Sequence, residues 1–117
     1  MSIDGRVQAV IDSGEEADEI LRAALAAVHE GAAAPWSAIA FVEEGRMAIG
    51  PVAGTAPDDT PAPALAVPIV YRGDTVAALW FGRPAEPAIV AELERAAALL
   101  APYCLVGWDT GGEEWVP

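Results

Sequence analysis

Residues 64–82, ALAVPIVYRGDTVAALWFG, contain the pattern that decides the fold. Two apolar runs, Ala64 to Tyr71 and Thr75 to Phe81, are separated by Arg72-Gly73-Asp74. Because Gly and Asp tolerate backbone conformations that other residues resist, this triplet predicts a turn between two antiparallel strands. We interpret the segment as the central hairpin of one small sheet.

The length and composition of the chain predict one folded domain over residues 1–117. A chain of 117 residues suffices for one hydrophobic core and is too short for two. Hydrophobic residues make up 54% of the sequence, which excludes a disordered acidic tail even though the net charge is −12.

The charge pattern excludes several classes of partner. The basic residues are six arginines, no two of them close in sequence, so we expect no nucleic-acid partner. Pro and Gly interrupt the apolar runs, so we expect no membrane span, and the N-terminus lacks the pattern of a secretion signal. The single cysteine, Cys104, cannot close an internal disulfide and fits a reducing cytoplasm.

The first residues predict a short helix or arm over residues 1–12. Ile3, Val7, Val10 and Ile11 recur at helical spacing and form one apolar stripe.

A longer helix is predicted to follow, from about residue 14 to residue 30. Ser13 is its predicted N-cap, and Glu16 three residues later completes a capping-box pattern. Gly31 is the predicted stop. The apolar stripe of this helix consists of Ile20, Leu21, Ala24, Leu25 and Val28.

A first hairpin precedes the central one. Its predicted strands are Trp36 to Val42 and Arg46 to Ala53, joined by a turn at residues 43–45. Residues 55–63 contain three prolines and two aspartates, so they form a loop.

A second long helix is predicted to begin at Pro87, because proline is accepted in the first turn of a helix. Its buried stripe consists of Ile89, Val90, Leu93, Ala97 and Leu100. Pro102 removes one helical hydrogen bond and predicts a kink, with residues 103–107 continuing the helix loosely. A short strand over residues 104–108 is the alternative, and residues 109–117 are predicted to form a tail.

The order helix, hairpin, loop, hairpin, helix resembles that of a GAF domain. The resemblance covers about residues 13–107 and rests on Val67-Pro68-Ile69 leading into the Arg72-Gly73-Asp74 turn and the strand after it. It implies an α+β fold with profilin- or PAS-like layering, in which an antiparallel sheet has long N- and C-terminal helices packed on one face. The loop 55–63 is too short for the helical lid of larger GAF domains, which argues against a deep, enclosed site.

The two faces of the sheet differ in their predicted roles. Since side chains alternate along a strand, Ile39 and Leu79 share one parity with Phe41 and Phe81, and Ala38 shares the other with Trp36 and Trp80. The resemblance implies that the Leu79 side meets the helices and that the tryptophans lie on the face where GAF domains bind ligands. The predicted ligand site is Trp36, Val42, Val67, Ala78 and Trp80. The alternative is that the loop 55–63 and the tail cover this face.

Catalytic and metal sites are not predicted. Asp109-Thr110-Gly111 spells the aspartic-protease triplet, but only six residues follow Gly111, so we interpret it as a polar turn. Cys104 has no second cysteine to resolve an oxidised thiol, which argues against the sulfoxide-reductase chemistry of one GAF-like family.

His29 is the only histidine, and no second His or Cys stands at ligand spacing, so we expect no metal and no cofactor. Asp58-Asp59 is interpreted as a pair of solvated loop carboxylates. We expect no Ser-His-acid triad, because His29 is predicted to lie on a helix that faces another layer.

The leading functional prediction is a sensory or regulatory GAF-like module that is not an enzyme and binds a small ligand or a protein partner. The resemblance further implies a homodimer through the first and last helices. The alternative is a protein-interaction module of roadblock or profilin type without a small-molecule site, and a sulfoxide-reductase-like enzyme is the third hypothesis.

Overall fold

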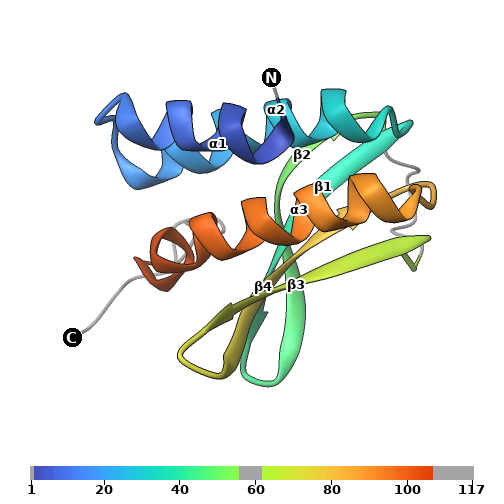
Figure 1. The fold of residues 1–117 in the computed structure, drawn as a ribbon. Helices are drawn as coiled ribbons and strands as arrows, with labels where there is room; N and C mark the ends of the chain where they lie inside the picture. Colours follow the sequence, from blue (N-terminus) through green and yellow to red (C-terminus); the bar gives the residue numbers. More distant parts are fainter. Residues whose placement is uncertain (1, 56–61, 107–117) are drawn as a thin grey trace.

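The computed structural model describes residues 2–55 and 62–106, which form a four-stranded sheet and a layer of helices (Figure 1). The elements in chain order are α1 (Ile3–Asp12), α2 (Ala17–Ala32), β1 (Trp36–Glu43), β2 (Arg46–Gly54), β3 (Leu65–Tyr71), β4 (Asp74–Phe81), α3 (Pro87–Leu100) and the 3₁₀ helix η1 (Ala101–Val106).

The sheet has the strand order β2-β1-β4-β3, and every neighbouring pair is antiparallel. Both predicted hairpins are present. Their turns, Glu44-Gly45 and Arg72-Gly73, have positive φ at both residues, the geometry that matches the twist of the flanking strands. In Figure 1 the two turns lie at the lower end of the sheet, away from the helices.

One face of the sheet forms the hydrophobic core with the helices, and we call it the inner face. Its central residues, Ile39 on β1 and Leu79 and Phe81 on β4, have no exposed surface. They belong to one cluster with buried residues of α2 and α3, among them Leu25 and Leu93. The opposite side of the sheet, which carries Trp36 and Trp80, is called the outer face.

Two predicted helix boundaries are wrong. Ser13 is not an N-cap: it ends α1, where its hydroxyl donates to the carbonyl oxygen of Val10 at 2.5 Å. The second helix begins at Ala17 rather than near residue 14, because Gly14 has a φ of +78° that no helix accommodates.

Gly31 also does not stop its helix. It lies inside α2, and a Cβ atom there would overlap the side chain of Ile3. The helix ends at Ala32, and its cap is Ala33, whose φ of 53° is left-handed. The glycine is therefore required for the packing of α1 on α2.

The last helix continues past Pro102 as predicted, but in a tighter form. Residues 101–106 are a 3₁₀ helix, and the alternative of a strand at this position is excluded for residues 104–106. Pro102 has no N–H group and cannot donate the hydrogen bond that would continue α3 as an α-helix. The chain therefore continues as the 3₁₀ helix η1, which accepts proline at this position.

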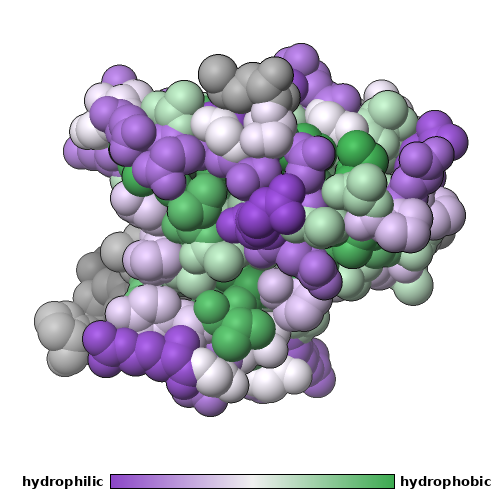
Figure 2. Space-filling model, in the orientation of Figure 1, coloured by the Kyte–Doolittle hydropathy of each residue, from purple (hydrophilic) through white to green (hydrophobic). Residues whose placement is uncertain are grey.

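The surface on the helix side is mostly hydrophilic. Figure 2 shows hydrophobic patches there that are small and separated from one another by hydrophilic side chains. Within residues 2–55 and 62–106, no helix is long and apolar enough to cross a membrane.

Candidate functional site

The strand register places both predicted tryptophans on the outer face. Trp80 on β4 lies opposite Ala38 on β1 and opposite Ala66 on β3. Residues paired in this way point to the same side of a sheet, so the indole of Trp80 stands between two small side chains.

Trp36 and Trp80 differ in their exposure. Trp80 is partly buried, whereas Trp36 is 5% exposed. The Trp36 ring lies over Gly82, where a Cβ atom would overlap the indole nitrogen and its neighbouring carbon. Trp36 therefore packs within the fold, and Trp80 is the more exposed of the two tryptophans.

The structure separates Val67 from the rest of the predicted site. Val67 is 2% exposed, pairs with Leu79 and belongs to the core cluster on the inner face. The cause is a β-bulge in β4: Val70 pairs with Thr75 and Ile69 with Ala77, so Val76 has no partner on β3 and the register shifts by one residue. Without the bulge the hairpin would pair Val67 with Ala78.

The other two predicted residues lie on the outer face. Ala78 is 5% exposed and pairs with Ala40 and Pro68, and Val42 is 38% exposed at the end of β1. Four of the five predicted residues thus share this face, and their role in ligand binding stays a prediction.

Sequence reasoning missed two exposed apolar residues of the outer face near the hairpin turns. Met47 on β2 pairs with Val42 and is 39% exposed, and Val70 on β3 is 44% exposed. Met47 could have been predicted from the sequence. The two-residue turn of the first hairpin sets the register of β2 with β1, and this register pairs Met47 with Val42. Exposed apolar side chains therefore lie near the two turns on three of the four strands, β2, β1 and β3.

A concave region lies beside the β2 edge. It is a shallow, open groove of about 390 Å³ between α2 and β2. Its lining is mostly apolar, with one cation, and consists of Arg22, Leu25, Ala26, Pro51, Val52 and Ala53.

His29 faces the sheet, contrary to the prediction that it faces another layer. Its Nδ1 atom lies 2.7 Å from the hydroxyl oxygen of Ser37, which begins the inner-face row of β1. Ser37 has no exposed surface, so this bond satisfies a buried hydroxyl. Within the described residues no carboxylate is hydrogen-bonded to His29, and the buried hydroxyl is not accessible to a substrate, so we assign the pair a structural role.

Cys104 is buried on η1 and contributes to the core cluster. Burial raises the pKa of its thiol to about 12, because the charged thiolate is disfavoured away from water. The reactive form is the thiolate, so this environment suppresses nucleophilic and redox chemistry.

We therefore predict that Cys104 reacts with a thiol reagent such as DTNB only after unfolding. At pH 8 the folded protein should show less than a tenth of the rate seen in denaturant, since a pKa of about 12 leaves roughly one thiolate in ten thousand at that pH. Equal rates in the folded and unfolded protein would contradict the buried assignment.

No group of three or more His, Cys, Asp or Glu side chains able to hold a metal lies within the described part of the chain. Asp58-Asp59 and Asp109-Thr110-Gly111 fall outside the described residues.

Comparison with solved structures identifies the architecture. The GAF domain from Acinetobacter phosphoenolpyruvate-protein phosphotransferase superposes with a TM-score of 0.68 over 96% of this chain and 95% of that one, at 12% sequence identity. The chain has a GAF-like fold. A type II free methionine-R-sulfoxide reductase from Thermoplasma acidophilum shares this fold, with a TM-score of 0.66 and 16% identity over 79% of this chain and 94% of that one.

Comparisons of the sequence add no relative. No family model matches the chain, and no curated protein is similar to it. At these low identities the likeness to solved structures establishes the GAF-like fold alone, which agrees with the resemblance seen in the sequence.

Proposed function

We propose that this GAF-like chain is a non-catalytic sensory or regulatory module that binds a small ligand on the outer face of its sheet. The observation that carries the proposal is the setting of Trp80, which is partly exposed between Ala38 and Ala66. Both neighbours are alanines, whose side chains are too short to extend far over the indole. A partly exposed aromatic ring between small side chains suits stacking of a flat apolar group.

The state of Cys104 supports a role without catalysis. A buried thiol with a raised pKa is a poor nucleophile, and it has no second cysteine in the sequence. This contrasts with the reductase activity that the name of the Thermoplasma protein gives. The Acinetobacter structure, by comparison, is a GAF domain from a phosphotransferase.

A protein-interaction module is the second candidate, and one observation favours it. Val42, Met47 and Val70 are each more than a third exposed and lie on three different strands of the outer face. A broad row of apolar side chains suits a protein surface better than a small molecule.

Native mass spectrometry of the purified protein distinguishes the candidates. We expect the wild type to carry a bound species that Trp80→Ala loses and that the matched outer-face variant Val70→Ala retains. Addition of the neutral dye Nile red should then change its emission with the wild type and not with Trp80→Ala. If the wild type carries no bound mass and the dye does not respond to Trp80, the small-ligand proposal fails.

The second candidate predicts a different result when Met47→Glu is added to the variants. An association of chains that Met47→Glu abolishes and Trp80→Ala leaves intact would support an interaction surface at the hairpin end. The predicted homodimer through the first and last helices, and the cytoplasmic location inferred from the lone Cys104, remain proposals of the same kind.

A further inference from the structure

We propose that α1 is an exchangeable helix, which can leave the seam between α2 and α3 and occupy the same seam in a second copy of this chain. In the structure α1 contacts both of these helices extensively, whereas α2 and α3 touch each other only sparsely. Ile3 and Val7 of α1 are buried in the seam and belong to the core cluster. The seam therefore needs a helix, and α1 is the one that fits.

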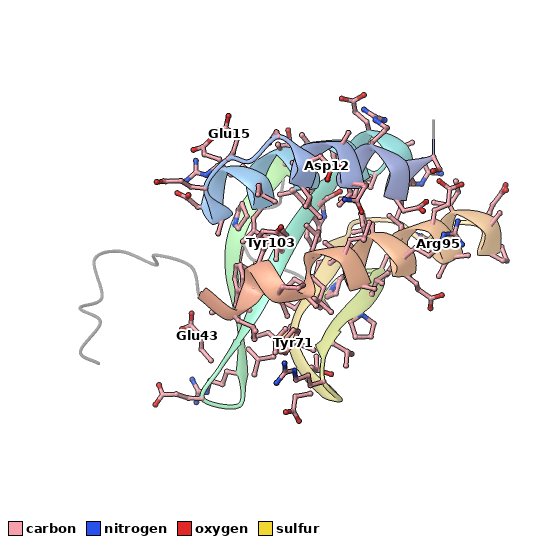
Figure 3. The ribbon with its side chains drawn as sticks, turned by 60° about the vertical axis from the view of Figure 1, so that its left-hand side comes forward. Asp12, Glu15, Glu43, Tyr71, Arg95 and Tyr103 are labelled. Atoms are coloured by element: carbon pink, nitrogen blue, oxygen red, sulfur yellow. The ribbon has the colours of Figure 1, made fainter. Side chains whose placement is uncertain are left out.

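The contacts that hold α1 come from residues distant in sequence. The carboxylate of Glu92 on α3 accepts a hydrogen bond from the Ile3 backbone amide at 2.7 Å. Arg95 pairs with Asp4 at 3.3 Å, and Figure 3 shows the Arg95 side chain on the part of α3 beside α1. None of these contacts depends on which chain supplies the helix.

The ion pair adds specificity to the N-terminal end of α1. Burial acts to raise the pKa of the Asp4 carboxyl, but the hydrogen bond from Arg95 and neighbouring donors outweigh it and lower the pKa below its ordinary value. Glu92 and Arg95 therefore bind the first turn of α1, and the side chain of Ile3 packs in the space left by the missing side chain of Gly31.

A ten-residue helix is not stable by itself in water, so α1 folds only when it occupies a seam. Whether it occupies its own or that of another copy depends on the link to α2. Residues 13–16 form this link, and Gly14 holds a φ of +78° with nothing within 4 Å of the position of a Cβ atom. The turn thus depends on this backbone conformation and on the hydrogen bonds of Ser13 and Gly14 to the end of α1, and nothing packs against the Cβ position of Gly14.

The charge at the link opposes the closed turn. Five carboxylates lie within residues 12–19, where the end of α1 meets the start of α2. Figure 3 shows Glu15 projecting away from the fold at this connection. Opening of the link moves Asp12 away from the four carboxylates at the start of α2, which lowers their mutual repulsion, while the exchanged helix keeps the contacts it had.

The fit of Ile3 against Gly31 gives a direct test. The variant Gly31→Leu cannot accept Ile3 because a side chain at position 31 would overlap it, and the variant Ile3→Ala leaves a hole in front of Gly31. If the two variants exchange α1, the intact Ile3 of the first meets the unmodified Gly31 of the second. The shortened side chain of the second variant then meets the enlarged side chain of the first. Both misfits are thus resolved in a heterodimer.

The experiment unfolds an equimolar mixture of the two variants in urea, refolds it and measures the masses by native mass spectrometry. We expect the heterodimer fraction to exceed the dimer fraction of co-refolded wild-type chains by at least about tenfold. The double variant Ile3→Ala/Gly31→Leu, which resolves the misfit within one chain, is the matched control and should be monomeric. A mixture without heterodimer, next to a folded double variant, overturns the proposal.

A second variant keeps the test independent of how well the first two fold. Gly14→Ala disfavours the positive φ of the link without touching any neighbour, so it should raise the dimer fraction several-fold. An unchanged dimer fraction in Gly14→Ala overturns the exchange of α1. Since the outer face is not involved, either result is separate from the outcome of the ligand experiments.

Discussion

Replacement of Leu79 by alanine is expected to lower the free energy of unfolding by about 2–5 kcal/mol, the cost of a cavity in a well-packed core. Leu79 has no exposed surface and is paired with Ile39 on one side and Val67 on the other, at the centre of the inner face. The inner face is closed by the helices, so the surrounding side chains have little freedom to fill the space.

The matched control is Val70→Ala on the outer face. Val70 is 44% exposed, so its truncation should cost less than about 1 kcal/mol. Urea unfolding followed by far-ultraviolet circular dichroism measures both variants. Equal losses in the two variants would contradict the assignment of Leu79 to the core and of Val70 to the surface.

Gly54→Ala is expected to be the most damaging of the glycine substitutions at the turns, with a loss of about 2–4 kcal/mol. Gly54 ends β2 with a φ of +80°, a conformation that strains any other residue. A Cβ atom would also collide with the carbonyl oxygen of Pro35 and approach the ring of His29 to 2.9 Å. Both the backbone strain and the collision act at one position.

Gly45→Ala is the control that separates these two causes. Gly45 has a φ of +78°, nearly that of Gly54, but nothing lies within 4 Å of its Cβ position. Gly45→Ala should therefore lower the free energy of unfolding only by the cost of the backbone strain, about 1–2 kcal/mol. If thermal or urea unfolding gives the same loss for both variants, the close approach of Pro35 and His29 to Gly54 is not present in solution.

The sequence predicted the sheet well because its signals are local. Glycine at the second turn position, as in Arg72-Gly73, specifies a two-residue hairpin whose flanking strands are set by alternation of apolar side chains. The order of the hairpins and helices was predicted from the residues, and the GAF-like fold that this order resembles is confirmed by the solved structures. The division of Ile39 and Leu79 from Trp80 followed from parity alone.

The failures share a different origin, which is contact between distant segments. The bulge in β4 aligns Val67 with Leu79 on the inner face, and no turn signal marks it in the sequence. Glycine often ends a helix, yet Gly31 lies inside α2. Its missing side chain leaves room for Ile3. The burial of Trp36 likewise depends on Gly82, which is distant in sequence.

His29 shows the same limit for the chemistry of the site. The sequence placed His29 in the last turn of its helix and indicated no hydrogen-bond partner for it. The hydrogen bond to Ser37 becomes visible only when α2 is placed against β1. A polar pair of this kind inside a core satisfies buried groups, and accessibility decides whether it has a further role.

On the outer face Trp80 is partly exposed and Trp36 is buried, and fluorine NMR tests this difference directly. The protein is labelled with 5-fluorotryptophan, its signals are assigned with Trp36→Phe and Trp80→Phe, and a soluble gadolinium relaxation agent is added. We predict strong broadening of the Trp80 signal and little change in the Trp36 signal, which belongs to a side chain 5% exposed. Equal protection of the two signals would contradict the account, because it would mean that the outer face around Trp80 is closed.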